Sequence, residues 1–145
     1  MNRLPINPIS KKPRAQIEHQ CTALWHTCIF LTFKGRCAKC GKLHVENSVG
    51  GRLWDGHHVI GSRFKRFRWE IDCGVLLCRL PCHRWATDNP TSFLEWLESN
   101  RPEQFAWRQA QVMRADHIPI WMLRATLDEL KGMETILRKK LVDRK

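Results

Sequence analysis

Two closely spaced pairs of cysteines constrain the fold of this chain more than any other feature of its sequence. Cys37 and Cys40 are separated by two residues and followed by Gly41, so their thiolates can lie on one side of a tight turn. Cys78 and Cys82 are separated by three residues, a spacing that also occurs in zinc sites. Four thiolates complete a closed tetrahedral site, in which Zn²⁺ contributes folding free energy rather than catalysis. The sequence therefore predicts a structural zinc that joins the two segments.

The other three of the seven cysteines do not belong to these pairs. An odd number of cysteines argues against a complete set of disulfides, and the first residues lack the apolar segment of a secretory signal. We therefore expect a cytoplasmic protein with reduced thiols. Cys21 and Cys28 fall on the apolar face of a helix expected over residues 15–33, where they would be small core residues.

The charge of the chain points to a polyanionic partner. It has 25 Lys and Arg residues against 14 Asp and Glu residues, a formal net charge of +11. Such an excess favours nucleic acid, because each neutralised phosphate releases counterions, although ribosomal and membrane-surface proteins share it. No run approaches the roughly eighteen apolar residues of a membrane span, so no membrane span is expected.

Apolar periodicity and turn residues predict an α+β fold in three parts. Residues 1–14 are rich in proline and in Lys or Arg and are expected to form a basic flexible tail. Residues 15–100 would form the core, which begins with the helix over residues 15–33 and continues with a hairpin over residues 36–60. Residues 101–145 would form a C-terminal helical extension.

The last expected helix begins near Pro119 and carries leucines at nearly heptad spacing. Two interpretations of this apolar stripe remain open: it packs against other helices of the same chain, or it joins two copies in a homodimer. Packing within the chain is favoured, because Gly132 lowers the helix propensity that a coiled coil needs.

Histidines surround the cysteine pairs in a pattern suited to metal chemistry. Adjacent side chains of a strand point to opposite faces, so His57 could bind a metal while His58 faces another group. His83 directly follows Cys82, so zinc would bring it towards the hairpin. His57 and His83 would leave metal positions for water and phosphate oxygens, and His58 could remove a proton from the attacking water. Asp55 is expected to be a structural neighbour of this centre, and two adjacent histidines without such surroundings are more often a polar strand edge.

A basic and aromatic loop over residues 62–69 follows the histidines. Its aromatic residues are more often part of a core than stacking platforms, whereas its cations could hold DNA phosphates near the metal. The residues expected to bind phosphates are Arg63, Lys65, Arg66 and Arg68 in this loop, and Arg79 and Arg84 beside the second cysteine pair.

Taken in order, these motifs resemble the HNH endonuclease family, and within it the small phage-borne branch related to the NinG recombination proteins. The resemblance covers residues 24 to about 97, roughly half of the chain, and the ordered combination is more specific than any single motif. The matching stretches are Gly35–Gly41 (GRCAKCG), Asp55–Gly61 (DGHHVIG), Arg68–Cys78 (RWEIDCGVLLC) and Cys82-His83.

The resemblance implies a zinc-stapled ββα-metal core, in which a hairpin and a helix hold one divalent cation, Mg²⁺ or Mn²⁺. It implies that His58 is the general base and that His57 and His83 bind the catalytic cation. It also implies that the four paired cysteines bind the structural zinc. Cys73 falls where the family has an asparagine that fixes the loop of the base.

The motifs and the resemblance together predict a metal-dependent DNA endonuclease that serves phage recombination or DNA processing in the cytoplasm of the host. Branched DNA and recombination intermediates are among the expected substrates. Two alternatives stay open. A zinc-dependent DNA-binding protein with weak or no cleavage activity is suggested by Cys73. A structural or partner-binding zinc protein is suggested by the C-terminal helices.

Overall fold

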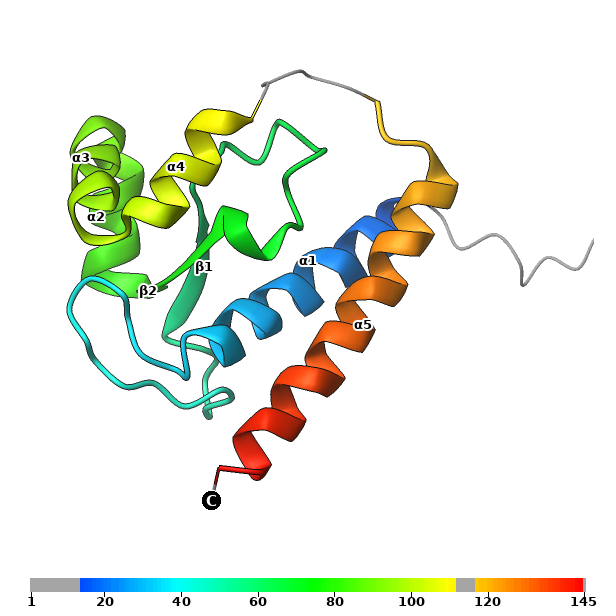
Figure 1. The fold of residues 1–145 in the computed structure, drawn as a ribbon. Coiled ribbons are helices and arrows are strands. Elements are labelled where there is room, and N and C mark those ends of the chain that lie inside the picture. The colour runs from blue at the N-terminus through cyan, green and yellow to red at the C-terminus, as the bar shows by residue number, and fades with distance from the viewer. Residues whose placement is uncertain (1–13, 112–116, 145) are drawn as a thin grey trace, which may run out of the picture.

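The computed structural model describes residues 14–111 and 117–144 and shows a mixed α/β fold (Figure 1). Of the basic tail expected over residues 1–14, all but the last residue lies outside the described ranges. The described residues form five α-helices, a two-stranded antiparallel sheet and two short helical turns, and none of these helices is long and apolar enough to cross a membrane. In chain order the elements are α1 (Arg14–Thr32), β1 (Trp54–His58), η2 (Ile71–Cys73), β2 (Gly74–Cys78), η3 (Arg79–His83), α2 (Arg84–Asp88), α3 (Pro90–Asn100), α4 (Pro102–Ala110) and α5 (Ile120–Val142).

The sheet differs from the hairpin expected over residues 36–60. β1 pairs with β2, and the register places His57 opposite Val75 and His58 opposite Gly74. The basic and aromatic loop is therefore the connection between the two strands rather than a segment after the hairpin. The turn residues wrongly predicted a hairpin within residues 36–60. The partner of β1 is instead β2, which is buried at every position, so burial of this apolar strand sets the pairing.

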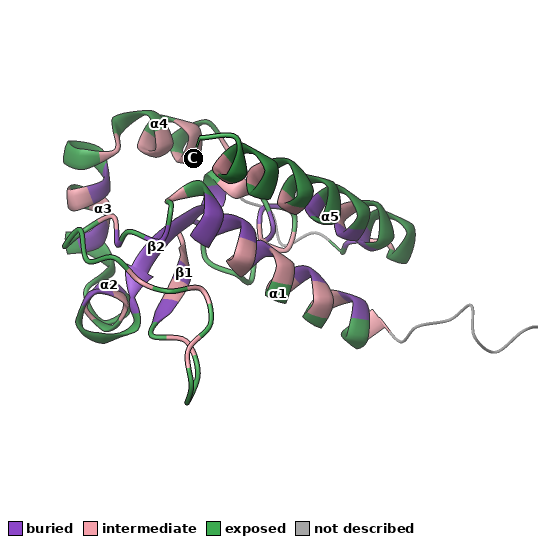
Figure 2. Cartoon of the chain, turned by 90° about the horizontal axis from the view of Figure 1, so that it is seen from below, coloured by how far each residue is buried: buried purple, intermediate pink, exposed green. Residues whose placement is uncertain are grey.

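Two apolar clusters flank the sheet, and β2 lies buried between them (Figure 2). Leu76 belongs to the cluster with α1 and α5, whereas Val75 and Leu77 belong to the cluster with α3. Side chains alternate between the faces of a strand, so Val75, Leu76 and Leu77 of β2 serve both clusters. Phe67 and Trp69 of the basic and aromatic loop are also buried, which confirms the prediction that they are core residues.

Helix α1 confirms the helix expected over residues 15–33, and it packs beside α5 (Figure 1). Leu123, Leu127 and Leu130 of α5 are buried in the same cluster as the α1 residues Cys21 and Cys28. The Cys21 thiol donates to the Leu123 carbonyl at 3.7 Å, and the Cys28 thiol donates to the Leu130 carbonyl at 3.6 Å. The buried leucines of the near-heptad stripe thus contact α1 of the same chain, and a homodimer would need another face of α5.

Two glycines of the sheet allow α1 to approach it closely. A Cβ atom at Gly74 would lie 2.6 Å from Cγ1 of Ile29 and 2.7 Å from Cζ2 of Trp25, and one at Gly56 would lie 2.8 Å from Cζ3 of Trp25. The Trp25 ring therefore occupies the space that a side chain at position 56 or 74 would need. Its position bears directly on the histidines described below.

We expect Gly74→Ala to lower the free energy of unfolding by about 1–3 kcal/mol, the usual cost of overpacking a core. Denaturant unfolding followed by far-ultraviolet circular dichroism measures the change. The matched control is Gly132→Ala on α5, where a Cβ would meet no atom within 4 Å. This control should gain about 0.5–1 kcal/mol from helix propensity. Equal stability of the Gly74→Ala protein and the wild type would contradict the close packing.

Candidate metal centres

The two cysteine pairs meet in one cluster. The Sγ atoms of Cys37, Cys40, Cys78 and Cys82 all lie within 4.8 Å of one another, and those of Cys40 and Cys78 are 3.3 Å apart. Tetrahedral zinc with Zn–S bonds of about 2.3 Å would separate its sulfurs by about 3.8 Å. The four cysteines thus fit a metal ion such as Zn²⁺ in number, element and spacing.

Local backbone structure positions the first cysteine pair. The Cys37 amide donates to the Lys42 carbonyl, and the Gly41 amide donates to the Cys37 carbonyl, both at 2.9 Å. Gly41 has φ +77°, a left-handed conformation that closes the turn. The Ala38 amide donates to the Leu76 carbonyl at 2.8 Å, which fastens the turn to β2 close to the second pair.

The thiols of the cluster need a cation if all four are to ionise. Burial raises the pKa of Cys37, but backbone amides of neighbouring residues outweigh it and lower the pKa to about 7. Burial and the negative charge of Cys37 raise the pKa of Cys82 to about 12, and burial with hydrogen bonds from the neighbouring thiols raises the pKa of Cys78 well above its usual range. Four adjacent thiolates repel one another unless a metal neutralises them.

His44 is a neighbour of this cluster that the sequence interpretation missed. Its Nε2 lies 3.1 Å from the Cys78 Sγ, and its backbone amide donates to the Gly35 carbonyl at 2.8 Å. Gly35 has φ +73°, and a Cβ there would lie 2.8 Å from the His44 carbonyl oxygen, so only glycine fits. The position of His44 four residues after Cys40 was the available signal.

His57 and His83 face each other beside the sheet. Their ring centroids are 5.2 Å apart, and the His57 ring also makes a T-shaped contact with Phe93 of α3. Burial, followed by the charges of His83 and His58, lowers the pKa of His57 to about 4. His57 is therefore neutral at pH 7, the state in which an imidazole binds a metal. Among the described residues the four cysteines are the only larger metal-binding group; these two histidines form a pair.

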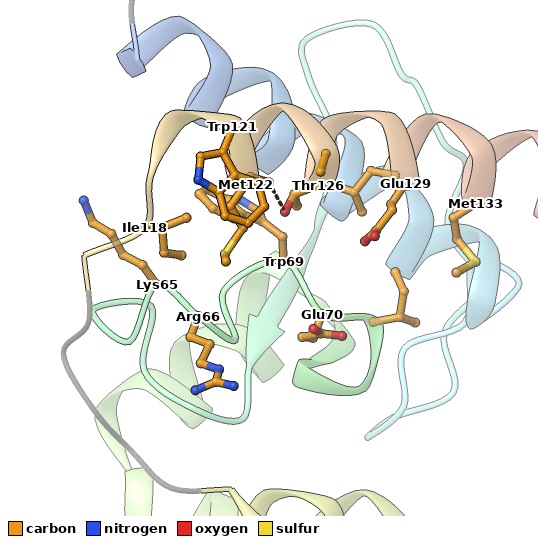
Figure 3. Close-up of a pocket in the computed structure, with 13 residues that line it drawn as sticks. Lys65, Arg66, Trp69, Glu70, Ile118, Trp121, Met122, Thr126, Glu129 and Met133 are labelled. Carbon is orange, nitrogen blue, oxygen red and sulfur yellow. Dashed lines mark hydrogen bonds between the residues drawn. The ribbon is translucent and has the colours of Figure 1, made fainter.

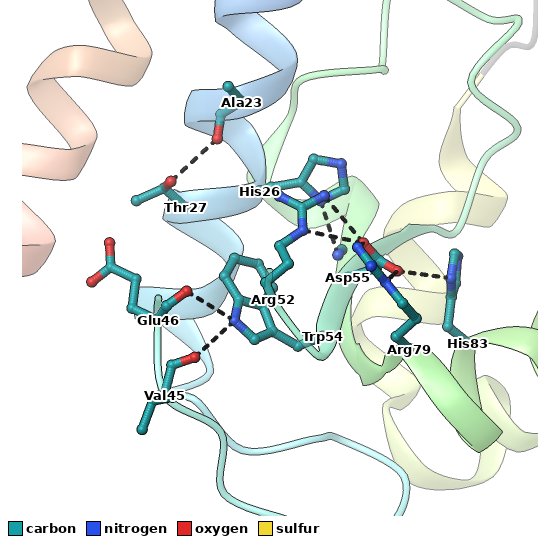
Figure 4. Close-up of polar contacts among 11 residues, drawn as sticks. Ala23, His26, Thr27, Val45, Glu46, Arg52, Trp54, Asp55, Arg79 and His83 are labelled. Carbon is teal, nitrogen blue, oxygen red and sulfur yellow. Dashed lines mark hydrogen bonds and ion pairs between the residues drawn. The ribbon is translucent and has the colours of Figure 1, made fainter. Parts of the chain in front are cut away.

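Asp55 holds His83 and two arginines (Figure 4). Its Oδ2 lies 3.3 Å from His83 Nδ1 and 3.2 Å from Arg79 Nε, and its Oδ1 lies 3.1 Å from Arg52 Nη2. Burial alone would raise the pKa of Asp55, but the hydrogen bonds and charges of these partners hold it well below its usual range. A carboxylate that accepts the Nδ1 proton of a histidine leaves Nε2 as the metal-binding nitrogen. Asp55 is thus a direct partner of His83.

His58 lies on the opposite face of β1, as strand alternation predicts. Its ring stacks on Trp25 with centroids 4.1 Å apart and planes 9° from parallel, and its Nε2 lies 2.9 Å from the Arg68 carbonyl oxygen. A carbonyl only accepts, so Nε2 carries the proton and Nδ1 is the basic nitrogen of the neutral ring. Burial lowers the pKa of His58, so this neutral form predominates at pH 7.

Cys73 holds the chain that follows β1. Its carbonyl accepts the Val59 amide at 2.8 Å, and its buried thiol donates to the Ile60 carbonyl at 3.6 Å. Burial raises the pKa of this thiol to about 11, so it remains a protonated donor. Cys73 therefore bonds to the segment directly after His58, with a weaker donor than an amide.

Of the six cations expected to bind phosphates, only Arg79 shares an ion-pair partner with His83. Arg79 is at Asp55, and Arg84 pairs with Asp88 at 3.7 Å on the surface. Lys65 pairs with Glu18 of α1 at 3.5 Å. In the rest of the loop, Arg63 lies over the Phe64 ring, Arg68 lies over the Trp69 ring, and Arg66 lines a groove described below.

Sequence interpretation also missed residues that come from outside the motifs. His26 of α1 accepts the Gly56 amide proton on Nδ1 at 3.0 Å, and burial lowers its pKa to about 4. Arg52 precedes β1 and reaches Asp55, and Trp25 supports His58. No local spacing marks these residues, because they reach the sheet only through the packing of α1 and the turn before β1.

Comparison of the chain with protein-family models, with curated proteins and with solved structures finds no match in any of the three. The groups that could carry out chemistry are therefore identified from the residues of this chain alone. These are a four-thiolate site for a metal such as zinc, a pair of histidines of which His83 has a carboxylate partner, and a third histidine with a basic Nδ1.

Proposed function

We propose that this protein is an HNH-type, metal-dependent DNA endonuclease with a zinc-stapled ββα-metal core. The observation that carries the proposal is the division of the adjacent histidines between the two faces of β1. His57 faces His83 at 5.2 Å, and His58 is held by the Arg68 carbonyl with Nδ1 as its basic atom. The succession of β1, β2 and α2 is compatible with the ββα-metal arrangement that the sequence motifs imply.

In the proposed site, His57 and His83 bind Mg²⁺ or Mn²⁺, which supplies Lewis-acid stabilisation of charge on the phosphate and the leaving oxygen. His58 accepts a proton on Nδ1 from the water that attacks the phosphorus. Burial is the main cause that lowers the pKa of His57 and of His58, and the charge of His83 lowers both further.

Asp55 has a positioning role in this proposal. It fixes the tautomer of His83 and holds Arg79 and Arg52 beside it, so two positive side chains stand where a phosphate would approach. These guanidiniums can make charge-assisted hydrogen bonds to phosphate oxygens. The net charge of +11 adds long-range attraction for DNA.

The structural zinc of the proposal binds Cys37, Cys40, Cys78 and Cys82. Cys78 ends β2 and Cys82 lies one residue before His83, so the zinc would fix the segment that carries His83. The proposed biological setting is phage recombination or DNA processing in the host cytoplasm, with branched DNA among the substrates. The second candidate function, zinc-dependent DNA binding with weak or no cleavage, is favoured by the weak hydrogen bond of Cys73.

The proposal is tested by cleavage of supercoiled plasmid with the zinc-loaded protein. Nicked and linear products should form only when Mg²⁺ or Mn²⁺ is added. We expect His57→Ala to weaken Mn²⁺ binding, measured by electron paramagnetic resonance, by about 10- to 100-fold or more and to reduce cutting accordingly.

The matched control is His19→Ala, which removes an exposed histidine of α1. It should bind Mn²⁺ and cut as the wild type does. Salt-sensitive DNA binding without cleavage by the wild type under either metal would replace the endonuclease with the second candidate. Unchanged Mn²⁺ binding by His57→Ala would exclude the proposed metal pair.

A further inference from the structure

A groove of about 380 Å³ lies between the loop that connects the two strands and the first half of α5 (Figure 3). Neither the cysteine cluster nor the histidines belong to it. Its size falls within the range of small-molecule and cofactor sites.

The side chains of the groove are ordered by charge. In Figure 3, Lys65 and Arg66 lie on one side, Glu70 and Glu129 lie on the other, and aromatic and apolar side chains lie between them. Burial and the charge of Glu129 raise the pKa of Glu70, in agreement with two carboxylates that face each other. The occupant of the groove should therefore offer negative charge at one end, a flat apolar middle and hydrogen-bond donors at the other end.

The middle of the groove presents apolar surface that the described chain does not cover. Trp121 is 65% exposed, and Met122 is 39% exposed. Trp69, in contrast, is buried, and its Nε1 donates to the Thr22 hydroxyl at 3.2 Å, so it forms a fixed wall. A large, mostly exposed indole beside a fixed aromatic wall is suited to stacking with a planar group.

We propose that this groove binds a nucleotide of an unpaired DNA strand. Lys65 and Arg66 contact its phosphate, Trp121 stacks on its base, and the carboxylates of Glu70 and Glu129 accept hydrogen bonds from the base. A nucleotide has the same order of groups as the groove: an anion, a planar apolar ring and polar edges. The choice of DNA as the polyanion rests on the proposed function.

The groove and the proposed base share one loop. The Glu70 carbonyl accepts the Nε1 proton of Trp25 at 2.8 Å, and Trp25 stacks on His58. The Arg68 carbonyl, two residues earlier, holds His58 Nε2. An unpaired strand in the groove would therefore lie against the same loop that positions His58, which suits a substrate with a junction between paired and unpaired DNA.

The carboxylates predict a preference among bases. The amino group of cytosine or adenine offers two N–H donors to the pair of carboxylates, whereas unpaired thymine offers only its single N3–H. Oligo(dC) and oligo(dA) should therefore bind more tightly than oligo(dT) of the same length. Glutamine can both donate and accept, so Glu129→Gln should reduce the ratio between these affinities even though the loss of a negative charge strengthens binding of all three.

The experiment measures the binding of fluorescently labelled single-stranded 12-mers by anisotropy, with zinc-loaded protein and no added Mg²⁺ or Mn²⁺. Trp121→Ala should weaken binding by roughly 5- to 100-fold, the usual effect of losing one base stack, and Trp121→Phe should restore most of the affinity. The matched control is Ile136→Ala, which removes a 53% exposed residue of α5 outside the groove and should have no effect. Circular dichroism checks that each variant is folded.

Equal affinity of Trp121→Ala and the wild type for all three oligonucleotides would overturn the inference. So would a dimer, seen by sedimentation, that Trp121→Ala dissociates without a change in DNA binding, because the occupant would then be a second copy of the chain. Plasmid cleavage by the wild type is a separate readout, which tests the endonuclease and not the groove. If the protein never cuts DNA but Trp121→Ala alone among these variants loses DNA affinity, the endonuclease proposal would be refuted and nucleotide binding in the groove would be supported.

Discussion

Replacing Cys78 with serine should leave the chain without zinc and largely unfolded at neutral pH and 25 °C. Structural zinc sites contribute an apparent binding free energy of about 10–16 kcal/mol, which equals or exceeds the whole stability of about 5–15 kcal/mol of an ordinary domain. Cys78 also ends the strand that lies between both apolar clusters, so loss of the metal loosens the centre of the fold. Elemental analysis for zinc and far-ultraviolet circular dichroism measure the two effects.

The control is Cys28→Ala, which removes a buried thiol outside the cluster. It should keep one zinc per chain and remain folded, with a loss of about 1–2 kcal/mol for the small cavity and the lost hydrogen bond. A folded Cys78→Ser protein that still holds one zinc per chain would exclude Cys78 as a necessary ligand.

The zinc content should also depend on pH in a definite direction. The pKa of Cys82 is about 12 without metal, and that of Cys78 is raised as well, so zinc must displace protons from these thiols. Protons therefore compete more strongly with zinc for these sulfur atoms as the pH falls. Zinc should leave, and the fold should weaken, on acidification rather than on raising the pH.

The second large effect is expected at His58. His58→Ala should reduce the rate of cleavage by about 10²- to 10⁴-fold, the usual contribution of a general base, while zinc content and Mn²⁺ affinity stay unchanged. The retained Mn²⁺ affinity distinguishes this variant from His57→Ala, because His57, unlike His58, is a proposed metal ligand. Single-turnover cleavage of plasmid measures the rate, with His19→Ala as the control.

The pH profile of the wild type gives an independent check on the base. Burial lowers the pKa of His58 below the ordinary value of 6.5, and the active form is the neutral one. Activity should therefore rise with pH to a plateau whose midpoint lies below 6.5. Full activity of His58→Ala, or a midpoint well above that value, would exclude His58 as the base.

The cysteine cluster could be predicted from the sequence because each pair is a local turn and the requirement for four ligands joins the two. The alternation of His57 and His58 was predictable for the same reason, since it depends only on the geometry of a strand. The pairing of β1 with β2 was not, because it depends on burying an apolar strand between two clusters that are assembled from the whole chain.

The surroundings of the histidines were also beyond prediction. His26 and Trp25 reach β1 because α1 sits close against Gly56 and Gly74, and nothing in the spacing of these residues announces that contact. The hydrogen bond of His44 to Cys78 likewise needs the chain to return past Gly35. Local patterns predicted which residues could bind metal; tertiary packing determines which atoms remain available for chemistry.

The contact between α1 and α5 has a consequence for synthesis of the protein on the ribosome. Cys21 and the Leu123 carbonyl that it meets are 102 residues apart in the chain. At about 5–20 residues per second, α1 waits roughly 5–20 seconds before its partner helix is translated. During that time the side of α1 that carries Cys21 and Cys28 lacks its partner α5, although Trp25 on the same helix can already pack against His58. The apolar core that α1 and α5 share is therefore completed only after α5 has been synthesised.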